Sequence, residues 1–165
     1  MVALSMMRIE IKGSNKAVRK LVETAAGYYA EKLMGKRIIA NLDININLKR
    51  NLRKNTDCEG TAIWEDDNIR PKEFTIEIDA GEKIRNLLII LAHEMVHIKQ
   101  WAKNEMYEYC KPGEVRFNKT KFNMSEIDYW DYPWEIEAFG RQLGLFIRFC
   151  EDNGLADCED MMDEA

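Results

Sequence analysis

The two histidines of this chain, His93 and His97, lie four residues apart in the segment L-A-H-E-M-V-H-I-K-Q, residues 91–100, and Glu94 directly follows the first. On a helix, this spacing places both imidazoles on one face, one turn apart, where their nitrogens can bind a single zinc ion. Glu94 lies on the flank of that face, within reach of a water on the metal rather than of the metal itself. The pattern predicts hydrolytic chemistry, in which zinc lowers the pKa of the water and Glu94 takes its proton as general base.

A chance match to H-E-x-x-H is the alternative, because the pattern also occurs on exposed helices that have no third ligand. Here the motif follows residues 87–92, which are apolar all round and therefore predict burial on more than one side. A buried histidine pair with a glutamate beside it would be costly without a partner, since each polar group loses its water. We therefore interpret the motif as a metal site.

A catalytic zinc site needs a third protein ligand, and no histidine remains to supply it. Aspartate, glutamate and cysteine are the remaining types, in a segment that folds back onto the motif helix. The segment P-W-E-I-E-A-F, residues 133–139, carries Glu135 and Glu137 among apolar side chains, and carboxylates in such surroundings need a partner such as a cation. Both glutamates are candidates for the third ligand.

Together, H-E-M-V-H-I-K-Q and P-W-E-I-E-A resemble the gluzincin-type zinc metallopeptidases, in particular small SprT-like and ImmA-like proteins of phages and bacteria. In that group, the first glutamate of a downstream E-x-x-A segment binds zinc, and its alanine allows close helix packing. The resemblance covers residues 60–150. It implies one zinc ion per chain, held by His93, His97 and Glu135.

Helical geometry agrees with this assignment, because Glu135 shares a face with Ala138 and Gln142, whereas Glu137 lies on a more charged face. The chain also departs from the family. Phe139 stands where related proteins often carry an Asp or Asn that orients a histidine, and the third histidine that SprT proteins use as a ligand has no counterpart. Glu137 therefore remains the alternative ligand.

The expected function is that of a zinc metalloendopeptidase, a hydrolase that acts on a peptide or protein substrate. One alternative is a binding or regulatory module that keeps the fold without efficient hydrolysis, and Phe139 favours it. Another is an SprT-like protease acting on DNA-associated proteins. The net charge of −5 argues against nucleic acid as a partner and leaves only the basic cluster at residues 48–54 in its favour.

Two further features bear on the substrate. Strands expected at 61–65 and 73–79, upstream of the motif, are candidates to pair with an extended peptide by strand addition. A tyrosine hydroxyl near the zinc could stabilise the oxyanion that forms during hydrolysis. The pattern does not choose among the aromatic candidates in and just beyond the connection, which are Tyr107, Tyr109, Tyr129, Trp130 and Tyr132.

The elements that position these residues follow from hydrophobic periodicity. Alternation predicts strands over 7–12, 38–48, 61–65 and 73–79, and helical spacing predicts helices over 15–34 and from 133 through 150. Asp79 and Glu82 form a predicted capping box for the motif helix, which would run to about Lys103, and a long connection fills 105–131. We expect an α+β, zincin-like (minigluzincin) domain, with a small mixed or antiparallel sheet packed on the motif helix and a C-terminal ligand-bearing helix.

With 165 residues, of which 46% are hydrophobic, the chain predicts one domain over residues 1–153 and an acidic, flexible tail over 154–165. The first residues show no signal region, and the longest apolar run is too short to cross a bilayer. The four cysteines are scattered without a C-x-x-C pair. These features predict a cytoplasmic protein with reduced thiols and no membrane partner.

Overall fold

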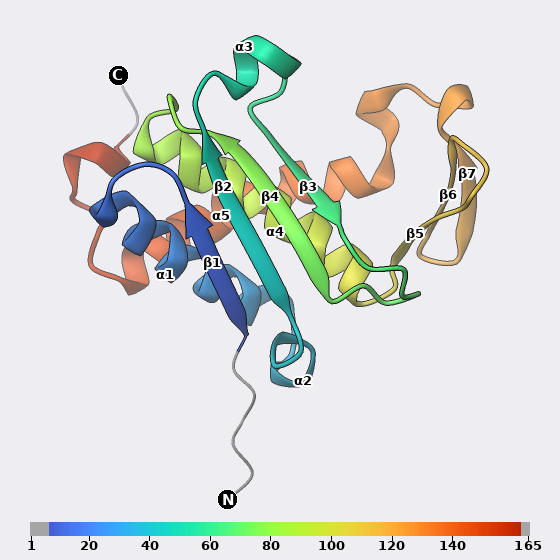
Figure 1. The fold of residues 1–165 in the computed structure, drawn as a ribbon, viewed down its shortest axis with the longest axis horizontal. Coiled ribbons are helices and arrows are strands. Elements are labelled where there is room, and N and C mark those ends of the chain that lie inside the picture. Colours follow the sequence, from blue (N-terminus) through green and yellow to red (C-terminus); the bar gives the residue numbers. More distant parts are fainter. Residues whose placement is uncertain (1–6, 163–165) are drawn as a thin grey trace, which may run out of the picture.

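The structure is a computed structural model that describes residues 7–162 of the chain (Figure 1). Its strands are β1 (Arg8–Lys12), β2 (Asp43–Lys49), β3 (Gly60–Trp64), β4 (Glu73–Asp79), β5 (Met106–Glu108), β6 (Glu114–Phe117) and β7 (Thr120–Asn123). Its α-helices are α1 (Lys16–Leu33), α2 (Lys36–Ile39), α3 (Leu52–Thr56), α4 (Ile84–Ala102) and α5 (Pro133–Asp152). Three short 3₁₀ helices complete it, η1 (Met124–Glu126), η2 (Tyr129–Asp131) and η3 (Glu159–Met161).

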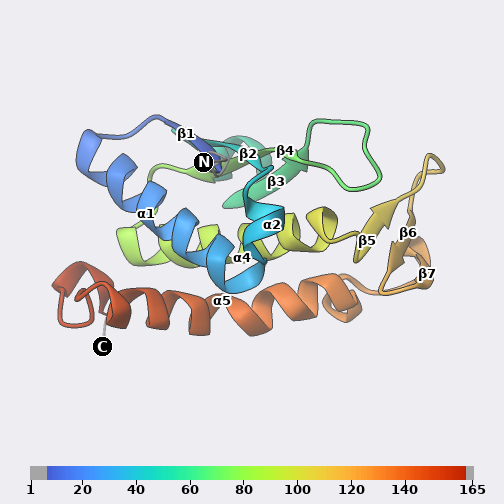
Figure 2. The same ribbon diagram turned by 90° about the horizontal axis from the view of Figure 1, so that it is seen from below.

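The main sheet has the strand order β1-β2-β4-β3, in which β1, β2 and β4 run parallel and β3 pairs antiparallel at the edge. Figure 2 shows α1 and α4 against one face of this sheet and α5 beyond them, as a third layer. The predicted α+β class is therefore confirmed, and the sheet is the mixed one of the two expected arrangements.

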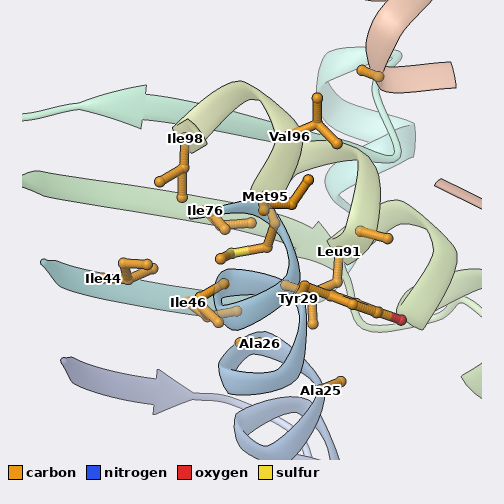
Figure 3. Close-up of a cluster of buried hydrophobic side chains, with 14 of the residues drawn as sticks. Ala25, Ala26, Tyr29, Ile44, Ile46, Ile76, Leu91, Met95, Val96 and Ile98 are labelled. Atoms are coloured by element: carbon orange, nitrogen blue, oxygen red, sulfur yellow. The ribbon is translucent and has the colours of Figure 1, made fainter. Parts of the chain in front are cut away.

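The core lies between the sheet and its first helical layer. Ile44 and Ile46 on β2 and Ile76 on β4 are fully buried and point toward Leu91 and Met95 of α4 (Figure 3). Burying one such side chain contributes about 1.5–3 kcal/mol, so this contact anchors α4 firmly on the sheet. The motif helix is thereby held by its apolar face, which leaves its other face free to meet α5.

The predicted connection 105–131 instead contains a small antiparallel sheet, β5-β6-β7, followed by η1 and η2. Its strands are only three or four residues long, and the turn between β6 and β7 is made by Asn118 and Lys119, both with positive φ (46° and 71°). Such a two-residue turn usually carries glycine, so the hairpin signal is weak in the sequence. The buried side chains of Val115 and Phe117 fix this sheet to the domain.

The strand predicted over 38–48 is wrong in its first half. Residues 36–39 form α2, and β2 begins only at Asp43. The adjacent Ile38 and Ile39 already break the period of two, and backbone hydrogen bonds to the Gly35 carbonyl close a helical turn there.

The predicted start of the motif helix is also wrong. Helix α4 begins at Ile84 after Lys83, and no side chain caps it. The Asp79 carboxylate accepts hydrogen bonds from the backbone N–H of Gly81 and of Arg53, each at 2.7 Å. Asp79 thus ties the turn after β4 to the start of α3 rather than opening α4.

The described part of the predicted tail packs on the domain. The Leu155 N–H returns to the Cys150 carbonyl at 2.8 Å, and Met161 in η3 is buried. Residues 163–165, and the N-terminal residues 1–6 on which the signal-region prediction rests, lie outside the described residues. No helix in the described range has both the length and the apolar character that crossing a membrane requires.

Candidate metal centre

Helices α4 and α5 pack together so that three ligand-type side chains meet between them. His93 and His97 lie on α4, and Glu135 lies in the first turn of α5. The Nε2 atoms of the histidines are 3.2 Å apart, and the Glu135 oxygens lie 3.2 Å from His93 Nε2 and 3.5 Å from His97 Nε2. All three ligand atoms fall within 4.8 Å of one another, so the group could hold a metal ion.

The hydrogen bonds around His97 determine which of its nitrogens faces this group. The Gln100 side-chain N–H₂ donates to the Trp134 carbonyl and to Glu137 Oε1, both at 2.9 Å. Its amide oxygen must therefore be the atom that lies 2.9 Å from His97 Nδ1, which makes that nitrogen the donor. The lone pair of His97 is then on Nε2, toward His93 and Glu135.

His93 is oriented in the same way from the other helix. Its Nδ1 lies 2.9 Å from Oε1 of Gln142 on α5, so its Nε2 also faces the group. Phe139 offers no hydrogen-bond acceptor to His93 and instead packs its ring edge-on against the His93 ring at 4.7 Å. Gln142, one helical turn further on, thus supplies the acceptor that Phe139 lacks.

The chemistry of this donor set fits a cation. Two imidazole lone pairs and a carboxylate converge on one point, and Glu135 Oε2 is buried with no hydrogen bond of ordinary geometry from the described residues. Such a set is repulsive unless a proton or a metal ion lies within it. Two nitrogens and one carboxylate oxygen are a ligand set that zinc accepts at catalytic sites.

Without a bound metal, the pKa values of His97 and Glu135 also indicate that this site favours positive charge at its centre. Burial opposes a proton on His97, but the hydrogen bond to Glu135 and the nearby Glu94 charge outweigh it and raise its pKa. Burial would raise the pKa of Glu135, yet its contacts with both histidines lower that pKa to about 2. The site therefore keeps Glu135 ionised and draws positive charge to its centre.

Glu137, the alternative ligand, is occupied elsewhere. Its carboxylate accepts from Lys99 Nζ at 2.7 Å and from Gln100 at 2.9 Å, and it lies 3.3 Å from Arg141 Nε. Lys99 is buried and also pairs with Glu105 at 2.6 Å. Glu135 is thus the glutamate that faces the histidines, whereas Glu137 holds the amide that orients His97.

Replacing Gln100 with leucine is expected to weaken zinc binding by about 10- to 100-fold, because His97 loses the acceptor that fixes its ring. Competition with a chromophoric zinc chelator measures this change, and circular dichroism verifies that the fold is retained. Arg141→Met is the matched control, since Arg141 contacts Glu137 but not Gln100. Equal zinc affinity of Gln100→Leu and the control would contradict this role.

Glu94 lies beside the ligand group. Its side chain is almost fully buried, with 6% of the residue exposed, and burial raises its pKa while the two histidines partly oppose that shift. Strand β3 passes directly over it, because a Cβ built on Gly60 would lie 2.5 Å from Ile90 Cγ2 and 3.5 Å from Glu94 Oε1. Glu94 is therefore confined between α4 and the edge strand.

A cleft of about 730 Å³ gives access to the centre. It is lined by Arg53, Asp57, Cys58, Glu59, Gly60, Arg85, Asn86, Ile89, Ile90, His93, Glu94, Tyr129, Phe139, Gln142 and Leu143. The cleft thus reaches from solvent to the first histidine of the motif and to Glu94, between α4, α5 and the segment that leads into β3.

Tyr129 is the one tyrosine that the described residues place along this cleft. Partial burial and the neighbouring Glu135 carboxylate raise its pKa to about 12, so its phenol is neutral and able to donate near neutral pH. Tyr132 donates instead to the Met124 carbonyl at 3.1 Å, and the ring of Tyr107 in β5 packs on that of Tyr109, which directly follows β5.

The edge of the main sheet also distinguishes the two predicted substrate-binding strands. Strand β4 is paired on both sides, so it offers no free hydrogen-bonding edge. Strand β3 lies at the edge of the sheet. Its first residue, Gly60, lies next to Ile90 of α4. At its other end, the Trp64 ring lies 5.3 Å from the ring of Trp101, near the end of α4. Strand β3 therefore lies along the part of α4 that carries both histidines.

Comparisons of the chain with protein-family models, with curated proteins and with solved structures gave no match. The interpretation of the centre therefore depends on its own geometry. The sequence did not predict that Gln100 and Gln142 orient the two histidines. It also did not single out Tyr129 as the tyrosine at the cleft. The spacing offered two signals: Gln100 lies three residues after His97 on one helix, and Gln142 shares a helix face with Glu135.

Proposed function

We propose that this protein is a zinc-dependent metallopeptidase with a zincin-like fold, resembling the gluzincin-type SprT-like and ImmA-like proteins. The observation that carries the proposal is the approach of Glu135, from α5, to the histidine pair of α4, with Glu94 at the same cleft. A ligand set alone would suit a structural zinc site. The additional buried carboxylate, beside the ligands but outside the group, favours catalysis.

The side chains have separate roles in this proposal. His93, His97 and Glu135 hold the zinc ion, which when bound acidifies a water molecule and polarises a substrate carbonyl. Glu94 accepts the proton of the attacking water and passes it to the departing amine.

The substrate is an extended peptide that adds to the free edge of β3. Backbone hydrogen bonds to this edge would hold the peptide along α4, so that one carbonyl lies between Glu94 and the metal ligands. Strand addition requires no particular side chain, which leaves selection to the walls of the cleft.

Tyr129 is the proposed donor to the oxyanion that develops on the attacked carbonyl. Replacing Tyr129 with phenylalanine is expected to lower kcat by about 100-fold, the usual effect of removing one such donor, while zinc content stays unchanged. Steady-state kinetics with a quenched fluorescent peptide measures this, with Tyr109→Phe as control because Tyr109 directly follows β5 and its ring packs on Tyr107. Unchanged kcat in Tyr129→Phe would remove this residue from the mechanism.

Hydrolysis of an unstructured protein by the zinc-loaded chain tests the proposal directly. We expect cleavage that a chelator abolishes and that added zinc restores, with fragments identified by mass spectrometry. A preparation that contains stoichiometric zinc and cleaves none of a diverse peptide library would favour the binding module instead. The departure at Phe139 no longer favours that module, because Gln142 orients His93.

A further inference from the structure

The two walls of the cleft differ in chemistry. Charged and polar groups from α3 and the segment that leads into β3 form one wall, where Arg53 is already paired with Glu59 at 3.0 Å. Across the cleft, on the α5 side, lie Phe139 and Leu143, both with large exposed areas. Ile89 adds to this apolar surface from α4.

The apolar wall is continuous with the candidate metal centre. The Phe139 ring packs against the ring of His93 at 4.7 Å and against the exposed ring of Trp130 at 5.4 Å. Phe139 and Leu143 lie one turn apart on α5, so their side chains extend the same surface away from the metal. A large exposed apolar surface that borders a functional cleft is typical of a ligand-binding site.

Exposure alone does not single out these residues, because α5 carries other exposed apolar side chains. Ile147 is 44% exposed and Leu143 is 45% exposed. Leu143 lines the cleft, whereas Ile147 is not among the residues that line it. Position relative to the metal centre, rather than exposure, is therefore the distinguishing observation.

We propose that the wall formed by Phe139, Leu143 and Ile89 receives a bulky apolar side chain of the peptide, next to the bond that is cleaved. The inference rests on the proposed peptidase function and adds its substrate class. A peptide paired with β3 directs alternate side chains to opposite faces, so a residue adjacent to the attacked carbonyl can enter the cleft. Burial of a leucine or phenylalanine side chain there, compared with alanine, corresponds to about a 10- to 100-fold preference.

The test uses two peptides that are identical except for phenylalanine or alanine next to the cleaved bond. Wild-type protein is expected to show about 10- to 100-fold higher kcat/KM for the phenylalanine peptide. Leu143→Lys should lose most of this preference, because a charge then lies on the wall. Ile147→Lys, on the same helix and equally exposed, should keep it, and zinc content should be equal in all three proteins.

A binding measurement keeps the inference separate from the proposed function. Fluorescence anisotropy of the same labelled peptides on zinc-loaded Glu94→Gln protein does not require turnover. Tighter binding of the phenylalanine peptide, weakened by Leu143→Lys alone, would support the apolar wall even if the wild type cleaved nothing. Equal affinity for the two peptides, a preference for a charged residue, or equal effects of the two lysine variants would overturn it.

Discussion

Replacing Glu94 with glutamine is expected to abolish peptide hydrolysis while the protein keeps its zinc. The glutamine has nearly the same shape but cannot accept the proton of the attacking water, and loss of a general base typically lowers the rate by about 100- to 10,000-fold. Zinc should remain because Glu94 is not part of the ligand group that His93, His97 and Glu135 form. The kinetics and the metal content are measured on the same preparation.

Without zinc, the variant should also fold at least as well as the wild type. Burial raises the pKa of Glu94, which means that the folded state disfavours its charged form, and the neutral glutamine removes this cost. Glu59→Gln is the matched control, since Glu59 lines the same cleft and its side chain forms an ion pair with Arg53. Activity close to that of the wild type in Glu94→Gln would exclude Glu94 as the general base.

The second large effect is expected from Glu135→Ala, which should abolish stoichiometric zinc binding. Two imidazoles alone leave the metal without the charged ligand that the α5 helix supplies. The loss should exceed the roughly 100-fold effect of a residue outside the ligand set. Isothermal titration with zinc measures the affinity of both proteins.

Glu137→Gln is the comparison variant for Glu135→Ala, because Glu137 was the alternative candidate for the third ligand. Glu137 is only two residues from Glu135, but its carboxylate binds Lys99 and Gln100. Its replacement should weaken zinc binding only through the orientation of His97, by no more than about 100-fold. If Glu137→Gln lost zinc and Glu135→Ala kept it, the two glutamates would have to exchange roles.

Local patterns in the sequence were sufficient to predict the helices that carry the candidate metal ligands. Helical spacing predicted α5, and Pro133 marks its start as expected. The motif helix was predicted from a capping box and the apolar run 87–92, and its start was wrong, because α4 begins at Ile84. Spacing on one helix also predicts that His93 and His97 face the same way. The third ligand could not be derived in this way, because it depends on how α5 packs on α4. The family resemblance favoured Glu135, and the helix face that it shares with Ala138 and Gln142 only agreed with that assignment.

What the sequence did not predict depends on contacts between distant segments. Gln142 contacts His93 only because α5 crosses α4 in one particular register. The spacing of Asp79 predicted a helix cap. Its carboxylate instead accepts a hydrogen bond from the backbone N–H of Arg53, which the sheet brings beside it. The short strands β5, β6 and β7 bury too few residues to give a clear alternating pattern.

The central claim, a zinc ion held by the histidine pair and Glu135, is tested most directly by the metal content and metal coordination of the purified protein. Elemental analysis should find about one zinc per chain, and X-ray absorption should show two imidazole nitrogens at about 2.0–2.1 Å with oxygen completing the shell. Protein that contains no zinc, and takes up none after dialysis against it, would contradict the account. His93, His97 and Glu135 would then form a hydrogen-bonded cluster without a metal.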